Sequence, residues 1–456
     1  MELLDLPPEI FKRIIHIFIL QSGVPKAWKD RQVCRAFARE IYEDTFAWQP
    51  ISAFETSGFY SSKIGIRIMN ADFVLYLSMR MKNPLDVNPY LPTKITEMLV
   101  FLEEKTATFT NERREECTRT LFEAVKHGVE DPASLLAWGP GKISKYGRPD
   151  DEDTSEQHQL AAAAAVGEWS VVRQLISGSM EAALKRSAIF GAPLAHIVAH
   201  GNLELSALIL GHFEHCEFKS QWTPGTLTKK VMRTTAEAIT AAIRHRHMEL
   251  LTSLVQWRKK RFGVREKLHY NAWLREAIRT GDPKFVKHVL GFTILSKPRV
   301  LKEHFEEACL LGNVDIVKQL IGDGKIPLAP GIKSKLWWPL YWAVRRGGSE
   351  VIAAVLEAGG NAPDSVSRGI EAAIERRNGT AIQLLLEKGT GTKSLASYEH
   401  LRLARNAKNE PIYELLRQEI RSKTEEDVPP FKKPKAKRAS RQKKTDTTQS
   451  SLPASN

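Results

Sequence analysis

The sequence predicts an all-α solenoid of stacked helix pairs, with a small helical unit before it and a basic tail after it. Three observations indicate this fold class. A motif of two short helices joined by a Gly-Asn or Gly-Asp turn recurs from about residue 122 to residue 417. The chain has 456 residues, which is too long for one ordinary globular core. A helix pair of this size cannot bury its own apolar stripe, so consecutive pairs have to stack on one another.

The turn defines the register of the repeat. The clearest copies run over residues 277–290 and 308–321, with turns at Gly281 and Gly312. The same position recurs at intervals of 30 to 45 residues, at Gly128, Gly167, Gly201, Arg246, Gly281, Gly312, Gly347, Arg377 and Lys408. We expect the residues four and three before each anchor to point inward and an apolar pair to follow in the second helix. The longest interval predicts a loop insertion at 217–230.

Two helical regions precede the array. Residues 1–46 predict a helical unit whose first helix enters through Pro7 and Pro8 and carries an apolar face at Ile10, Ile14 and Ile17. After a turn at Gly23, a second apolar run continues to residue 41. Residues 47–118 predict a helical connector, with helices near 73–81 and 91–102, and the repeat array is assigned to 119–420. The array ends in a more polar pair over 401–420, as expected for a terminal cap.

Two copies of this motif resemble a known family. Trp338-Pro339-Leu340-Tyr341 leads to Gly347, and Ala192-Pro193-Leu194-Ala195 leads to Gly201. The array resembles ankyrin repeats, whose first helix opens with Thr-Pro-Leu-His before an Ala-Ala and a Gly. The Thr-Pro-Leu-His signature is nowhere intact. The resemblance therefore implies a divergent ankyrin-type array that binds a protein on its concave face.

The N-terminal unit carries a second resemblance. Leu6-Pro7-Pro8-Glu9-Ile10 and Val33-Cys34-Arg35-Ala36-Phe37 closely resemble the two signatures of an F-box, although the segment between them lacks the leucine-rich second helix. The resemblance implies docking on a Skp1-type adaptor of a cullin ubiquitin ligase. The residues matched to adaptor contact are Leu6, Pro7, Pro8, Ile10, Ile14, Val33, Cys34 and Phe37. The alternative is that this hairpin only caps the array or forms a dimer surface. An F-box-like unit joined to degenerate ankyrin repeats is also similar to a large group of filamentous-fungal proteins.

The partner-binding face follows from the ankyrin register. In such repeats the residue five before the anchor lies toward the concave side, which selects His196, Glu276, Glu307 and Trp342. Trp342 is flanked by Trp337 and Tyr341, and aromatic side chains are enriched at interface hot spots. We therefore predict partner binding by His196, Glu276, Glu307, Trp337, Tyr341 and Trp342. The alternative for Tyr341 and its neighbour Trp338 is that they fill the space of the missing consensus Thr and His.

The charge is concentrated at the C-terminus. Of the formal net charge of +14, half comes from residues 428–456, where eight Lys or Arg face one acid, Asp446. Residues 421–456 lack apolar periodicity, so we expect a disordered basic tail. Its basic run has the density of a nuclear-localisation signal or a nonspecific nucleic-acid contact: Lys432, Lys433, Lys435, Lys437, Arg438, Arg441, Lys443 and Lys444. A solvated tail without function is the alternative.

Other chemistry has little support in the sequence. The run 389–394 lacks the Gly before Lys that a phosphate loop needs, and His212, His215 and Cys216 offer no fourth zinc ligand. His245 and His247 are expected to point apart on a helix. The four cysteines have no short-range pairing, and no apolar run is long enough to cross a membrane. We expect a monomeric intracellular protein of the cytoplasm or nucleus, not an enzyme, without cofactor, metal or membrane.

These features predict a protein–protein interaction module. The leading hypothesis is a substrate-recognition adaptor of a Skp1-cullin-F-box ubiquitin ligase, whose array holds the target near the conjugating centre and raises its effective concentration. The alternative is an ankyrin scaffold of the cytoplasm or nucleus without a ubiquitin role, with a tail that directs it to the nucleus or contacts nucleic acid.

Overall fold

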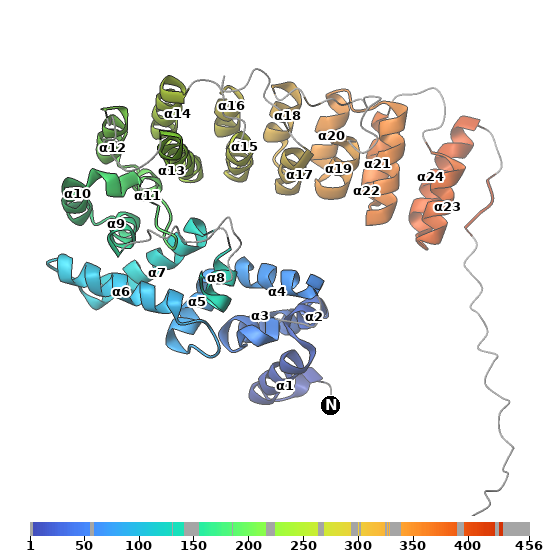
Figure 1. Ribbon diagram of the computed structural model, residues 1–456. Coiled ribbons are helices and arrows are strands. Elements are labelled where there is room, and N and C mark those ends of the chain that lie inside the picture. Colours follow the sequence, from blue (N-terminus) through green and yellow to red (C-terminus); the bar gives the residue numbers. More distant parts are fainter. Residues whose placement is uncertain are drawn as a thin grey trace, which may run out of the picture. The chain divides into compact units, whose positions relative to one another are not determined.

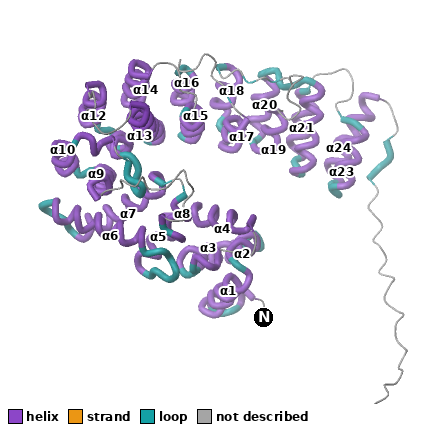
Figure 2. The backbone as a smooth tube through the Cα atoms, viewed as in Figure 1, coloured by secondary structure: helices purple, strands orange, loops and turns teal. Residues whose placement is uncertain are grey.

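The computed structural model describes the chain as helices joined by turns and loops (Figures 1 and 2). It describes residues 3–54, 59–129, 131–140, 155–184, 186–215, 224–262, 269–292, 300, 302–323, 326, 328, 339–389, 396–424 and 428–431. These ranges hold 24 α-helices and one isolated antiparallel bridge, between Ser187 and Gly191. None of these helices is long and apolar enough to cross a membrane. The chain divides into two compact units, residues 1–298 and 299–456.

The N-terminal part of the first unit contains eight helices. They are α1 (Pro8–Ser22), α2 (Val24–Asp30), α3 (Arg35–Ala47), α4 (Phe59–Ala71), α5 (Phe73–Lys82), α6 (Tyr90–Lys105), α7 (Asn111–Gly128) and α8 (Pro132–Trp138). The second apolar run of the N-terminal unit is thus split into α2 and α3. The helices expected near 73–81 and 91–102 are present as α5 and α6, whereas α4 was not predicted.

Four helix pairs follow in the first unit. They are α9 (Ser155–Val166) with α10 (Trp169–Gly178), α11 (Pro193–Ala199) with α12 (Leu203–His215), α13 (Pro224–Arg244) with α14 (Met248–Phe262), and α15 (Tyr270–Arg279) with α16 (Pro283–Leu290). The first helices pack in succession, from α7 through α9, α11 and α13 to α15. Pro224 starts a long helix, so part of the predicted insertion at 217–230 is helical and not a loop.

The second unit repeats this arrangement over four more pairs (Figure 1). They are α17 (Lys302–Leu311) with α18 (Val314–Gly322), α19 (Pro339–Arg346) with α20 (Ser349–Glu357), α21 (Pro363–Arg376) with α22 (Gly379–Lys388), and α23 (Tyr398–Asn406) with α24 (Glu410–Thr424). First helices pack on first helices and second helices on second helices, which makes two layers. The predicted solenoid of helix pairs is confirmed at this level.

The chain continues to pack beyond residue 420. Helix α24 runs to Thr424, and Val428 is buried against it. The Nε of Arg417 donates to the carbonyl of Val428 at 2.7 Å, and the ring of Phe431 lies 5.3 Å from that of Tyr413. The last helix pair is therefore longer than predicted from the sequence. The basic run from Lys432 to Lys444 lies outside the described residues.

The predicted register is confirmed by burial and by backbone geometry, except at Arg405, which lies three residues before the last anchor and is exposed instead of pointing inward. The residues four before the anchors are buried in every pair, at Ala124, Ala163, Ile197, Ala242, Ala277, Ala308, Ala343, Ala373 and Ala404. Gly167, Gly201, Gly281 and Gly312 adopt positive φ, as expected for the residue that ends a helix in the left-handed region. Arg246, Arg377 and Lys408 adopt the same conformation, with φ of 62°, 55° and 54°. Gly128 and Gly347 do not adopt positive φ, although both lie at the anchor position.

The two arginines at anchor positions have a compensating contact. Arg246 donates to the carbonyl of Thr280 at 2.6 Å, and Arg377 donates to that of Ala407 at 3.4 Å. Each carbonyl lies at the turn of the next helix pair, where the last carbonyls of a helix lack partners within the helix. Each of these hydrogen bonds therefore joins two neighbouring helix pairs and offsets the strain of the left-handed backbone at the arginine. Lys408 lies in the last described pair, α23–α24, and the structure describes no further helix pair after it.

We expect Lys408→Gly to raise the free energy of unfolding by about 1 kcal/mol, because a left-handed residue with a Cβ costs about 1–2 kcal/mol. The matched opposite change is Gly281→Ala, where φ is +70° and an added Cβ meets no atom within 4 Å, so only the backbone conformation is tested. It should destabilise the protein by a similar amount. Urea denaturation followed by circular dichroism measures both, and a loss of stability in Lys408→Gly would contradict the register.

Candidate partner-binding surfaces

Helix α1 has two apolar faces, and only one of them is buried. Phe11, Ile15 and Ile19 form the buried face. Ile10, Ile14, Ile17 and Leu20 are 47, 37, 44 and 49 % exposed and follow one another at helical spacing along the opposite side. We call these four residues the α1 stripe. Soluble proteins seldom leave a continuous apolar row in water unless it meets a partner.

The residues predicted to contact an adaptor lie at or near this surface. Pro7, Pro8, Ile10, Ile14 and Val33 are exposed, and Val33 is 71 % exposed in the turn between α2 and α3. Leu6, Cys34 and Phe37 are half-buried. The Phe37 ring packs edge-on against Phe11 at 5.5 Å, so it also supports the buried face of α1.

A buried polar network holds the helix that presents the stripe. The Nδ1 of His16 lies 2.8 Å from Oδ1 of Asp44 on α3, and the amide of Gln49 contacts both side chains. The hydroxyl of Tyr76 on α5 donates to the carbonyl of Gln49 at 3.2 Å, and the buried Arg80 donates to that of Ala47. These contacts join α1 and α3 to α5, although Oε1 of Gln49 and Nε and Nη1 of Arg80 are buried without a hydrogen-bond partner among the described residues.

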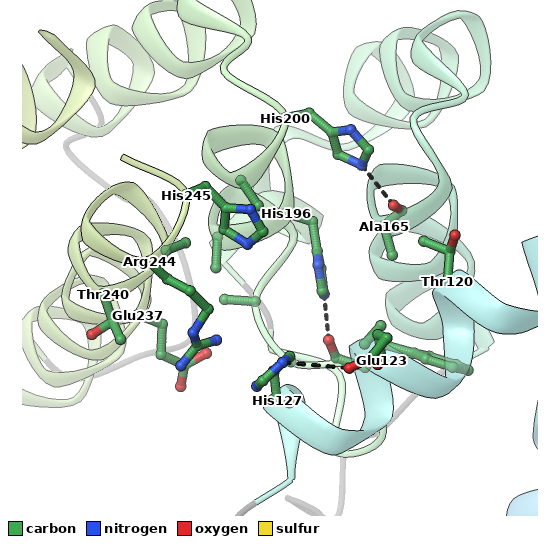
Figure 3. A pocket seen from close by; sticks show the side chains of 18 residues that line it. Thr120, Glu123, His127, Ala165, His196, His200, Glu237, Thr240, Arg244 and His245 are labelled. Carbon is green, nitrogen blue, oxygen red and sulfur yellow. Dashed lines mark hydrogen bonds and ion pairs between the residues drawn. The ribbon is translucent and has the colours of Figure 1, made fainter. Parts of the chain in front are cut away.

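The first unit also contains a pocket of about 470 Å³ on its layer of first helices (Figure 3). Side chains of α7, α11 and α13 line it, together with Ala165 of α9 and the turn before α11. The space exists because the helices meet there through glycine and alanine, which have no side chain beyond Cβ: Ala124, Gly128, Ala165, Gly191, Ala192, Ala195, Ala199 and Ala241. Four histidines surround it, His127, His196, His200 and His245.

Two of these histidines are oriented by backbone carbonyls. The Nε2 of His196 bonds to the carbonyl of Phe190 at 2.5 Å, and that of His200 bonds to the carbonyl of Ala165 at 2.7 Å (Figure 3). Because a carbonyl only accepts, Nε2 carries the proton in both rings. Each Nδ1 is then an acceptor when the ring is neutral. His196 was predicted from the register, and it lines this pocket.

The pocket favours neutral imidazole. Burial lowers the pKa of His196 and of His127, and the positive charge of Arg244 adds to the effect at His127. Burial and then Arg244 also lower the pKa of His245. His245 lies in the turn after α13, where its ring stacks on that of His247 with an interplanar angle of 10°, so the expectation that the two point apart on a helix was wrong.

The fixed charges around the pocket are paired. Glu237 accepts from the Nε of Arg186 at 2.8 Å, and Arg244 donates through Nε to Glu276 at 2.6 Å. Glu123 lies 3.3 Å from Lys126. The predicted residue Glu276 therefore contributes indirectly, by holding Arg244 at the wall. The pocket can take an uncharged or weakly polar group that donates hydrogen bonds to the imidazoles.

The remaining predicted partner residues belong to the second unit. Glu307 is half-buried on α17. Trp342 is half-buried, with Tyr341 edge-on at 5.3 Å and the Nζ of Lys302 at 4.2 Å from its ring centre. The Nε1 of Trp342 is buried without a hydrogen-bond partner among the residues that the structure describes. Trp337 and Trp338 lie outside those residues.

Sequence reasoning missed most of the pocket. His127, His200 and His245 each directly precede an anchor, at Gly128, Gly201 and Arg246, so they share one register position that was not singled out. Glu237 and Arg244 lie elsewhere in the register. The residue that the register did select was His196, which precedes its anchor by five residues. Within the described ranges no three His, Cys, Asp or Glu side chains are placed to hold a metal ion. Cys216, named with His212 and His215 in the weak zinc pattern, is not among the described residues.

Comparison with known proteins adds little to this description. No family model matches the chain, and no curated protein matches it. Among solved structures, one match is described as a circular tandem repeat protein with novel repeat topology and enhanced subunit contact surfaces. It is 14 % identical, with a TM-score of 0.15, and the match covers 91 % of this chain and 84 % of the other.

Proposed function

We propose that the chain is a non-enzymatic interaction protein that serves as a substrate-recognition adaptor of a Skp1-cullin-F-box type ubiquitin ligase. The N-terminal unit docks on the Skp1-type adaptor, and the repeat array, of divergent ankyrin type, binds the target. The single observation that carries this proposal is the α1 stripe. Four aliphatic side chains lie exposed on the helix that opens with Leu6-Pro7-Pro8-Glu9-Ile10.

The structure around the stripe suits a docking role. The same helix buries Phe11, Ile15 and Ile19 on its other side, so covering the stripe with a partner needs no refolding of the unit. The network of His16, Asp44 and Gln49 holds the helix in place before the partner arrives. Such preorganisation lowers the entropy cost of association.

The target side of the proposal rests on the pocket in the first unit. His196 and Arg244 lie at its wall, and Glu276 holds Arg244 there through an ion pair. The pocket offers a recess in which a side chain of a target protein can be desolvated, and interface hot spots favour such recesses. Tethering that target near a conjugating centre then requires no chemistry from this chain.

The test is binding of a purified Skp1-type adaptor to the full chain, measured by isothermal titration calorimetry. We expect Ile10→Glu with Ile14→Glu to weaken binding by about a hundredfold or more, because two apolar contacts are lost and two carboxylates would be buried. Both side chains are exposed, and glutamate is a good helix former, so the unit should stay folded.

The matched control is Leu203→Glu with Leu208→Glu. These leucines are 42 and 50 % exposed on α12, and the double change adds the same charge to another helix. It should leave adaptor binding unchanged. A folded wild-type chain that does not bind the adaptor would reduce the N-terminal unit to a cap of the array and leave the ankyrin scaffold as the working description.

A further inference from the structure

The second unit contains a polar recess of about 370 Å³ lined by four arginines. Arg345 and Arg346 end helix α19, and Arg376 and Arg377 end its neighbour α21. The first turn of α22 closes the recess through Asn378, Gly379 and Thr380. We call it the arginine recess. It is separate from the histidine-lined pocket, which belongs to the first unit.

No acidic side chain offsets these charges in the part of the chain that the structure describes. The recess has no Asp or Glu in its lining, and none of the four arginines takes part in an ion pair within the described ranges. Arg345 donates to the hydroxyl of Tyr341 at 2.5 Å and Arg377 to the carbonyl of Ala407 at 3.4 Å. These neutral acceptors position two guanidinium groups and leave their charge intact.

The position of the arginines explains only part of the cluster. Arginine in the last turn of a helix complements the helix dipole, and one such residue per helix would serve that purpose. Four in one recess repel one another, so the arrangement costs free energy while the recess is empty. An anion bound there would remove this repulsion.

The start of α22 adds two donors. The Oδ1 of Asn378 accepts from the amide of Ala381 at 3.0 Å, which caps the helix. The amides of Gly379 and Thr380 lie in the same first turn, where a helix has no acceptor of its own, and both residues line the recess. The start of a helix carries partial positive charge and favours an anion.

We propose that the arginine recess binds a phosphorylated side chain of the protein held by the array. Guanidinium groups pair with phosphate through two parallel hydrogen bonds. A phosphoryl group presents three oxygens and nearly two negative charges, which matches several guanidinium groups and two amides better than the two oxygens of a carboxylate do. The recess is larger than the phosphoryl group alone and accommodates the neighbouring peptide.

The lining favours a peptide over a nucleic acid. No aromatic side chain lines the recess, and single-stranded nucleic acid is bound largely through base stacking on aromatic rings. The four charges also gather at one point, whereas a nucleic-acid backbone calls for an extended row. This inference rests on the proposed function, because it names the chemistry of the target that the array selects.

The experiment uses the full chain and a degenerate peptide library with a fixed central phosphoserine, beside the same library with serine or with glutamate. Binding of each library is measured by fluorescence anisotropy, and a single-stranded RNA oligonucleotide is tested in the same way. We expect the phosphoserine library to bind about tenfold or more tightly than the other two, since charge-assisted hydrogen bonds are the strong ones.

Arg346→Ala with Arg376→Ala should remove this preference, because two of the four guanidinium groups of the recess are lost. Both arginines are exposed, so their loss should leave the helices intact. The control is Arg368→Ala with Arg402→Ala, which removes the same charge from arginines already paired with Glu371 and Glu399, at 2.7 and 2.5 Å. It should keep the preference. Three outcomes would each overturn the proposal. All three libraries could bind equally, the glutamate library could bind as tightly as the phosphoserine library, or only the RNA could show binding that depends on the arginines. Adaptor binding is measured separately, so its failure is distinguishable from failure of the recess.

Discussion

Replacing Trp273 by alanine is expected to lower the free energy of unfolding by about 3–5 kcal/mol, the largest effect of any single change considered for this protein. Trp273 lies on α15 and is fully buried. Its Nε1 donates to the carbonyl of Ala236 on α13 at 3.2 Å, and its ring lies 6.4 Å from that of Phe292. Removing the indole leaves a cavity between two neighbouring helix pairs.

The matched control is Trp48→Ala, because Trp48 is 57 % exposed at the end of α3. Its loss should change stability by less than about 0.5 kcal/mol, as is usual for surface positions. Trp273→Phe should fall between the two, since the ring persists and the hydrogen bond is lost. Urea denaturation followed by far-ultraviolet circular dichroism gives all three values. Similar losses for Trp273→Ala and Trp48→Ala would contradict the packing described for α13 and α15.

The second large effect is expected for Gly128→Ala. An added Cβ at Gly128 would lie 2.5 Å from the carbonyl carbon of Phe190 and 2.6 Å from the amide nitrogen of Gly191. Both are backbone atoms, so a side-chain rotation cannot relieve the clash. Overpacking of this kind costs about 1–3 kcal/mol or more. The change should also close part of the histidine-lined pocket, since all three residues line it.

The opposite result is expected for Gly211→Ala. Gly211 lies inside α12, and an added Cβ there meets no atom within 4 Å. Alanine should therefore raise the free energy of unfolding by about 0.5–1 kcal/mol through the better helix propensity alone. Thermal unfolding of the two variants side by side separates crowding from propensity. If Gly128→Ala were as stable as the wild type, α7 and the turn before α11 could not approach as closely as the structure shows.

The sequence alone determined the helix-pair architecture and its register. One turn position, read at Gly281 and Gly312, placed Arg246, Arg377 and Lys408 at anchors, and the structure shows that all three adopt the left-handed conformation although none of them is glycine. The register succeeded because a stacked repeat must bury equivalent positions in each copy, so the constraint is local and recurs along the chain.

The tertiary structure decided what local patterns left open. Periodicity identified the row of Ile10, Ile14 and Ile17 as one apolar face of α1, but Phe11, Ile15 and Ile19 form a second, and only packing against α3 selected the buried one. The pocket and the arginine recess likewise combine residues from separate helices. The distances between those helices depend on how closely alanine and glycine let them pack, which no single stretch of sequence specifies.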